Sequence, residues 1–209
     1  MEKTDRSFLK EEAFSILEML AVIVIATILL ALITRGVGHL VEGSRLTQAG
    51  ANVVDEINYA RAVALARNDP AEVWFLRLPS EPGGMDLAYR AVRSRVLAVD
   101  GSTSWISRTQ RLPDGIVISP SKERSNCIGG QIVQAVSAAP EVVDGVGIRI
   151  YPNGRTEAVN PAPTLELSDP LFLTIGRERD IADTGSSLPP NFIVVQIEPR
   201  NGRVTTLRP

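Results

Sequence analysis

The chain has 209 residues, of which 44% are hydrophobic and 22% are charged, and its formal net charge at pH 7 is −2. A balance this close to neutral gives no global attraction to nucleic acid or to an anionic membrane surface. Because Cys127 is the only cysteine and His39 the only histidine, the sequence offers no intrachain disulfide, Ser-His-Asp triad or zinc site, and we expect neither catalysis nor a cofactor.

The first long element is an apolar run over residues 14–34, which reads FSILEMLAVIVIATILLALIT. About 20 apolar residues are enough to span a bilayer as a helix, so the run predicts a transmembrane helix that follows a leader of residues 1–13. Glu18 is its only charge, and a carboxylate in hydrocarbon costs about 2.5–3.5 kcal/mol on insertion scales. No partner for Glu18 is evident in the same helix. Cleavage between Ala13 and Phe14 would create an amine with which Glu18 of a neighbouring subunit could pair.

The helical pattern continues over residues 35–68 as an amphipathic stem. Small and apolar residues recur at intervals of three or four and predict one buried face: Leu46, Ala49, Val53, Ile57, Ala60 and Ala64. Asn68, Asp69 and Pro70 predict the end of the helix. Four glycines interrupt the stem, namely Gly36, Gly38, Gly43 and Gly50. They indicate a hinge, or else close helix packing or a short break between two helices, and these interpretations stay open.

Residues 69–209 have the two-residue periodicity of strands and predict a β-rich head. The expected strands cover 72–78, 86–93, 96–99, 105–112, 115–119, 146–151, 171–175, 192–198 and 203–208. The PNG at 152–154 and the RNG at 200–202 predict hairpins. Residues 120–145 and 177–191 are expected to be surface loops. The expected fold class is therefore α+β, with a long N-terminal helix packed on an antiparallel sheet.

The segment AFSILE, followed at once by an apolar helix, resembles the class III signal of type IV prepilins and type II secretion pseudopilins. The resemblance implies that a prepilin peptidase cuts after Ala13, which stands where the family usually has Gly, and methylates the new terminus at Phe14. It also implies that Glu18 governs fibre assembly. The implied partners are the peptidase, other pilin or pseudopilin subunits and an inner-membrane assembly platform. The implied location is the inner membrane, with the head in the periplasm.

Three segments of the stem and head resemble the GspH and FimT type of minor pseudopilin: INYARAVALARNDPAEVWF, GIRIYPNGRTEA and VQIEPRNGRV. These three segments, with LTQAG at 46–50 and LPDGIVIS at 112–119, make the chain most similar to the prepilin-like proteins called Verru_Chthon cassette protein D. The resemblance implies a pilin-like fold and a structural subunit of a type IV pilus or type II secretion pseudopilus. A plain single-pass anchor carrying a β domain is the alternative.

Some FimT-like pilins act in DNA uptake through a basic C-terminal region, so we also considered the arginines of the head. Arg200, Arg203 and Arg208 are candidate DNA contacts, and a second group consists of Arg90, Arg93 and Arg95. Arg93 and Arg95 would share one face of a strand. No aromatic residue interleaves with either group to stack bases, which favours ordinary solvated arginines.

A calcium site was considered for the carboxylates of Glu178, Asp180 and Asp183. Arg177 and Arg179 alternate with these residues, and the segment lacks an EF-hand pattern. We therefore expect a solvated loop and no metal.

Overall fold

The computed structural model describes residues 15–80, 87–129, 131–137, 142–160, 170–182 and 189–208, with side chains from residue 31 to 41 and at residue 182 left undescribed. The chain divides into two compact units, Met1–Glu42 and Gly43–Pro209. The cleavage residues Ala13 and Phe14 lie outside the described residues. Each unit is described by itself below.

Within the described residues, one long helix precedes a sheet, and two short helices lie between strands of that sheet in the chain order. The helices are α1 (Ile16–Arg67), α2 (Asn126–Gly129) and α3 (Glu178–Ala182). The strands are β1 (Ala71–Pro79), β2 (Leu87–Leu97), β3 (Thr103–Trp105), β4 (Gln110–Arg111), β5 (Ile116–Ile118), β6 (Gln134–Ser137), β7 (Val142–Ile150), β8 (Thr156–Ala158), β9 (Leu171–Arg177), β10 (Phe192–Ile197) and β11 (Val204–Leu207).

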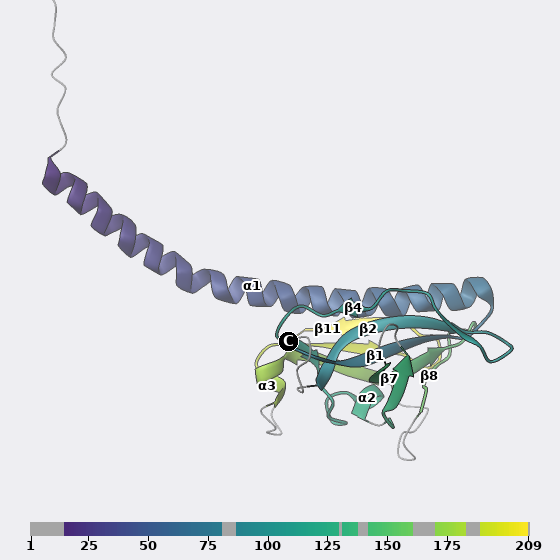
Figure 1. The fold of residues 1–209 in the computed structure, drawn as a ribbon. Coiled ribbons are helices and arrows are strands. Elements are labelled where there is room, and N and C mark those ends of the chain that lie inside the picture. The colour runs from purple at the N-terminus through teal and green to yellow at the C-terminus, as the bar shows by residue number, and fades with distance from the viewer. Residues whose placement is uncertain are drawn as a thin grey trace, which may run out of the picture. The chain divides into compact units, whose positions relative to one another are not determined.

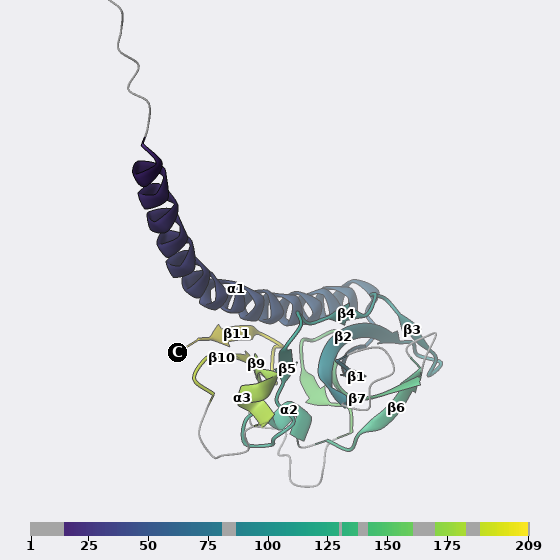
Figure 2. The same ribbon diagram turned by 60° about the vertical axis from the view of Figure 1, so that its left-hand side comes forward.

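The described strands form one sheet in the order β11-β10-β9-β5-β2-β1-β7-β6, while β3 and β4 pair with β2 and β8 pairs with β7. Every pair is antiparallel. The part of α1 that belongs to the second unit lies along one face of this sheet (Figure 1). Figure 2 shows that β1, β2, β3, β6 and β7 curve around a second, smaller interior. The predicted helix on an antiparallel sheet is confirmed.

The stem buries the face that the sequence pattern indicates. Leu46, Ala49, Val53, Ile57, Ala60 and Ala64 are all buried in one core with the inner face of the sheet. The helix ends at Arg67, and Asn68 follows it with a φ of 56°, the left-handed conformation that closes many helices. The predicted buried face of the stem and the predicted end of the helix are therefore confirmed.

The glycines of the stem have different consequences. Helix α1 is continuous from Ile16 to Arg67, so the interpretation of a break between two helices is wrong. A Cβ added at Gly50 would lie 3.0 Å from Cδ1 of Ile193, which shows that this glycine permits close packing of the stem on β10. A hinge at Gly36 and Gly38 stays a prediction.

A buried carboxylate also fastens the stem to the head. Glu56, 2% exposed, accepts hydrogen bonds from the hydroxyl of Ser107 and, at 3.1 Å, from Nε2 of Gln110. The hydroxyl of Tyr59 donates to the carbonyl of Ile106 at 3.2 Å. These contacts hold the connection between β3 and β4 against the helix, because a buried carboxylate is tolerated only with its hydrogen bonds made.

The side chains of β1 pack into two different cores, one on each face of the sheet, because successive side chains of a strand point to opposite faces. Val73 and Phe75 belong to the core under the stem, whereas Trp74 and Leu76 belong to the smaller core on the opposite face. Trp74 lies opposite Gly147 of β7, where an added Cβ would lie 3.0 Å from the indole. The glycine at this position of β7 therefore makes room for the indole.

Several strand boundaries differ from the prediction. The strands expected at 86–93 and 96–99 form the single strand β2, and the one expected at 105–112 is replaced by the short strands β3 and β4. The expected surface loop at 120–145 is wrong in part, because it contains α2 and β6 and buries Ser125, Cys127, Ile128 and Val136. Only scattered apolar residues in this segment meet the core, so no periodic pattern marks them. Strand β8 was likewise not expected. The surface loop expected at 177–191 is wrong in part, because helix α3 forms its first residues and buries Ile181.

Candidate assembly interface

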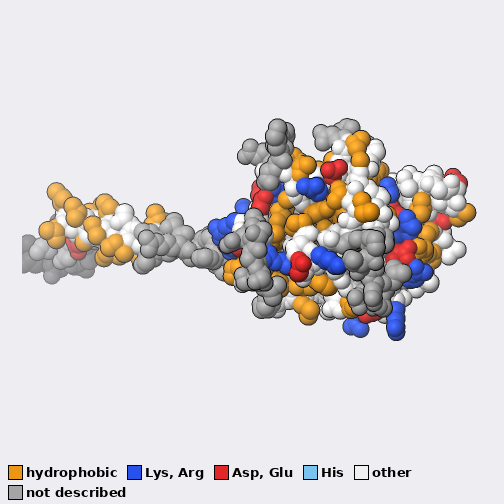
Figure 3. All heavy atoms as spheres, turned by 90° about the horizontal axis from the view of Figure 1, so that it is seen from below, with side chains coloured by type: hydrophobic (Ala, Val, Ile, Leu, Met, Phe, Trp, Pro, Cys, Tyr) orange, Lys and Arg blue, Asp and Glu red, His pale blue; other side chains and the backbone are white. Residues whose placement is uncertain are grey.

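The first turns of α1 expose apolar side chains on every side. Ile16, Leu17, Leu20 and Leu30 are between 62% and 88% exposed, and residues 15–30 are all classed as exposed. Figure 3 shows hydrophobic side chains over the visible face of this segment. A helix that is apolar all round is normally buried, in a membrane or against other helices, so this segment needs a covering partner.

Among the helices that the structure describes, none has a stretch both long and apolar enough to cross a membrane.

Glu18 has a local partner that the sequence analysis did not identify. The backbone N–H of Glu18 donates to Oγ of Ser15 at 3.2 Å, and the backbone N–H of Ser15 donates to Oε2 of Glu18 at 3.4 Å. This reciprocal pair is a capping box, in which Ser15 caps the helix and Glu18 occupies its third position. The spacing Ser-x-x-Glu in front of an apolar run was the available signal. Because the contact is with an uncharged backbone group, the pairing of Glu18 with a cation of a neighbouring subunit stays a prediction.

The terminal hairpin separates the candidate DNA contacts. Arg200 and Arg203 line a shallow hollow with Gln196, Glu198, Asn201 and Thr205. Arg208 lies on the other face of the hairpin, where its Nη1 donates to Oγ1 of Thr47 on the stem at 2.9 Å. The alternation of side chains along β11 explains the split, since residues 203 and 205 face one way and 206 and 208 the other. The three arginines therefore do not form one basic groove, and DNA contact by any of them stays a prediction.

The arginines of β2 contact aromatic residues after all. Arg93 lies over the ring of Trp105 at 4.4 Å from its centroid, and Arg95 lies over Trp74 at 4.5 Å. Arg93 and Arg95 share a face, as predicted, since both also approach Trp105. The tryptophans come from the neighbouring strands β1 and β3, so inspection of one segment alone could not find them.

Glu72 binds the same cluster together from β1. Its side chain is 1% exposed; Oε2 accepts from Nε of Arg95 at 2.7 Å and from Nε1 of Trp74 at 3.0 Å, and Oε1 accepts from Nη2 of Arg149 at 2.7 Å. Burial alone would raise the pKa of Glu72, but the hydrogen bond from Arg149 and the charge of Arg95, with the further hydrogen bonds from Trp74 and Arg95, hold it below its ordinary value. The cluster ties β1 to β2 and β7.

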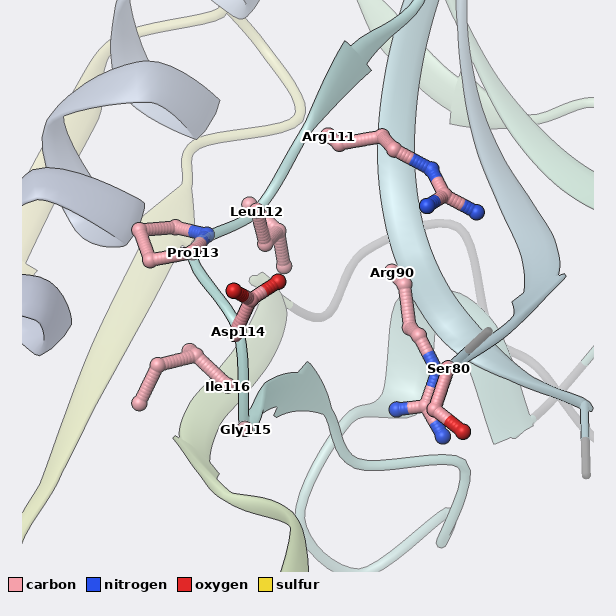
Figure 4. A pocket seen from close by; sticks show the side chains of 8 residues that line it. All are labelled: Ser80, Arg90, Arg111, Leu112, Pro113, Asp114, Gly115 and Ile116. Carbon is pink, nitrogen blue, oxygen red and sulfur yellow. The ribbon is translucent and has the colours of Figure 1, made fainter. Parts of the chain in front are cut away.

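Arg90, the third arginine of the second group, lies apart from Arg93 and Arg95. It lines a hollow of about 340 Å³. Figure 4 shows the guanidinium groups of Arg90 and Arg111 on one side of this hollow and the carboxylate of Asp114 on the other. Arg90 makes a two-point ion pair with Glu178, one contact being 2.8 Å from Nη1 to Oε2. Nη2 of Arg111 donates to the carbonyl of Pro79 at 3.2 Å. These contacts fasten β2 and β4 to their neighbours.

The carboxylates of the calcium candidate and the single cysteine have other roles. Glu178 is the partner of Arg90, and Asp180 lies 3.6 Å from Nε of Arg179, while Asp183 lies outside the described residues. Cys127 is fully buried in α2, and burial raises the pKa of its thiol. Among the described residues, no group of three potential ligands that could hold a metal ion occurs.

Comparisons with known proteins found little similarity. No protein-family model matches the chain, and no curated protein matches it. Among solved structures, the type IV minor pilin FimU of Pseudomonas aeruginosa is 14% identical and superimposes with a TM-score of 0.43, over 79% of this chain and 93% of that one. A likeness this coarse assigns no function, and the helix-on-sheet architecture rests on the elements described above.

Proposed function

We propose that the protein is a pilin-like structural subunit that assembles through the first turns of α1 into a fibre of the type IV pilus or type II secretion kind. The observation that carries this proposal is that the two ends of one continuous helix have different surroundings. Its C-terminal part is fastened into the core of the head, and its N-terminal part exposes an apolar surface with a single charge. Such a helix suits a protein that joins other copies through its stem.

The resemblance of AFSILE to prepilin signals supports the rest of the proposal. A prepilin peptidase cleaves after Ala13 and methylates Phe14, and residues 14–34 anchor the chain in the inner membrane with its head in the periplasm. An assembly platform then inserts the subunit into the fibre. The resemblance of the head segments supports a role as a minor subunit of the GspH and FimT type. The protein has no enzymatic role in this account.

Glu18 is the assembly acid of the proposal. In the separate chain its carboxylate has only the 3.4 Å contact to the Ser15 N–H and no ion pair within the described residues. That contact is long for a hydrogen bond, so a cationic partner on a neighbour would bind the carboxylate more strongly. The resemblance supplies one such partner, the processed amine of Phe14.

The proposal is tested by fibre incorporation of the full chain, expressed with a prepilin peptidase and its assembly components. Glu18→Lys is expected to lower the fraction in sheared fibres at least tenfold, because the charge then repels the neighbour's cation. The amount in the membrane fraction should not change. Asn58→Lys, an exposed position on the stem, serves as the matched control and should incorporate normally. Normal incorporation of Glu18→Lys would refute the role of Glu18, and absence of the unmodified chain from fibres would refute the proposal itself.

A further inference from the structure

The stem and the terminal strand enclose an apolar groove that the proposed function does not yet use. It measures about 360 Å³ and lies wholly within the second unit. Figures 1 and 2 both show β11 beside α1. The lining is mostly apolar and consists of Thr47, Gly50, Ala51, Val54 and Asp55 from α1 with Ile193, Thr206 and Arg208 from the β10–β11 hairpin.

Arg208 brings a positive charge to the lining of this groove, which also contains the carboxylate of Asp55. Within the described part of the chain its guanidinium has one hydrogen bond, to the hydroxyl of Thr47, and no ion pair. By contrast, Arg90, Arg95 and Arg149 of the same head each have a carboxylate partner. A guanidinium in the lining of an apolar groove is a favourable place for a carboxylate, since apolar walls strengthen the attraction between charges.

The first turns of α1 have the complementary composition. Glu18 is the only charge between residues 15 and 34, and its neighbours Leu17 and Met19 are 79% and 58% exposed. The mostly apolar lining of the groove contains the guanidinium of Arg208 and the carboxylate of Asp55, and this segment offers one anion among apolar side chains.

We propose that the groove of one copy receives the first turns of α1 from a second copy, with Glu18 paired to Arg208. This inference rests on the proposed function and names a partner group within it. It differs from the expectation drawn from the prepilin resemblance, in which Glu18 pairs with the amine of Phe14. The two partners make different predictions for substitutions at Arg208.

The first test is disulfide crosslinking between copies of the full-length chain in mild detergent. The native Cys127 is fully buried and its thiol pKa is raised, so it should not take part. One copy carries Leu17→Cys and the other Thr206→Cys, and oxidation should give a crosslinked dimer. Thr205→Cys is the matched control, because residue 205 lines the hollow on the opposite face of the hairpin. Equal crosslinking through 205 and 206, or none through 206, would overturn the proposal.

A charge exchange between the two copies then identifies the partner of Glu18. Glu18→Arg in the Leu17→Cys copy, or Arg208→Glu in the Thr206→Cys copy, should each lower the crosslinked fraction by roughly tenfold. The two substitutions together should restore it. If Glu18 does not pair with Arg208, Arg208→Glu alone will have no effect and the exchange will not restore the crosslink. This readout needs no fibre, so its failure is distinguishable from a failure of the chain to assemble.

Discussion

At the scale of single residues, Glu72 shows how a carboxylate on a strand organises its surroundings. It accepts hydrogen bonds from Arg95, Arg149 and Trp74, which belong to three different strands. The arginine side chains are 19% and 27% exposed, whereas the carboxylate is 1% exposed. A buried charge with its hydrogen bonds made is stable, but the removal of one partner leaves the others uncompensated.

We predict that Glu72→Gln lowers the free energy of unfolding of the unit Gly43–Pro209 by about 2 kcal/mol, because two arginines lose their counter-charge but can partly reach water. Urea unfolding followed by circular dichroism measures the change. Glu123→Gln, at an exposed turn, is the control and should stay within about 0.5 kcal/mol. Equal effects of the two substitutions would show that the cluster does not stabilise the head.

The lowered pKa of Glu72 also predicts a pH dependence. A carboxyl group whose pKa is lower in the folded than in the unfolded state stabilises the protein at pH values above the unfolded-state pKa. This stabilisation is lost as the pH falls through the folded-state pKa. The difference in unfolding free energy between the native chain and Glu72→Gln should therefore be full above the ordinary value of 4.5 and shrink in more acidic buffer. A difference that grows on acidification would contradict the assignment.

At the scale of elements, the stem is held by packing of small and apolar residues rather than by charge. Ile57 is fully buried, while its neighbour Asn58 is exposed. We predict that Ile57→Ala costs about 2–4 kcal/mol of unfolding free energy because it leaves a cavity between helix and sheet. Asn58→Ala should change the same urea transition by less than about 0.5 kcal/mol. A packed core normally loses more than about 1 kcal/mol on such a truncation, so a cost below about 1 kcal/mol for Ile57→Ala would mean that the stem packs only loosely on the sheet.

The same element shows what a sequence can predict. The spacing of Leu46, Ala49, Val53 and Ile57 predicts the buried face because helical periodicity is local. Glu56, by contrast, is hydrogen-bonded to Ser107 and Gln110, which lie about fifty positions further along the chain and follow no local pattern. The same limit applies to Arg93 and Arg95, whose tryptophans come from other strands.

The missed elements have a related cause. Strands β6 and β8 and helix α2 are short, with three or four residues each, and take their order from the neighbours they pack against. The capping of Glu18 by Ser15 is different, since the Ser-x-x-Glu pattern is local and was readable.

At the scale of the whole molecule, the charge distribution argues against nucleic acid as the main partner. The net charge is −2, and the terminal arginines are divided between two faces of a hairpin. We predict that the unit Gly43–Pro209 shows no strongly salt-dependent DNA binding in a fluorescence anisotropy titration, because such binding needs several cations on one surface. Binding that weakens steeply with salt and is lost in Arg200→Ala/Arg203→Ala would instead support the DNA-uptake function.

The central claim is that the apolar start of α1 becomes the N-terminus of an assembling subunit. The most direct measurement is the intact mass of the N-terminal peptide after the full chain is expressed with a prepilin peptidase. A peptide that begins at Phe14 and carries one added methyl group is the result that the account predicts. A peptide that still begins at Met1 would contradict it and leave a β domain carried by an uncut apolar helix.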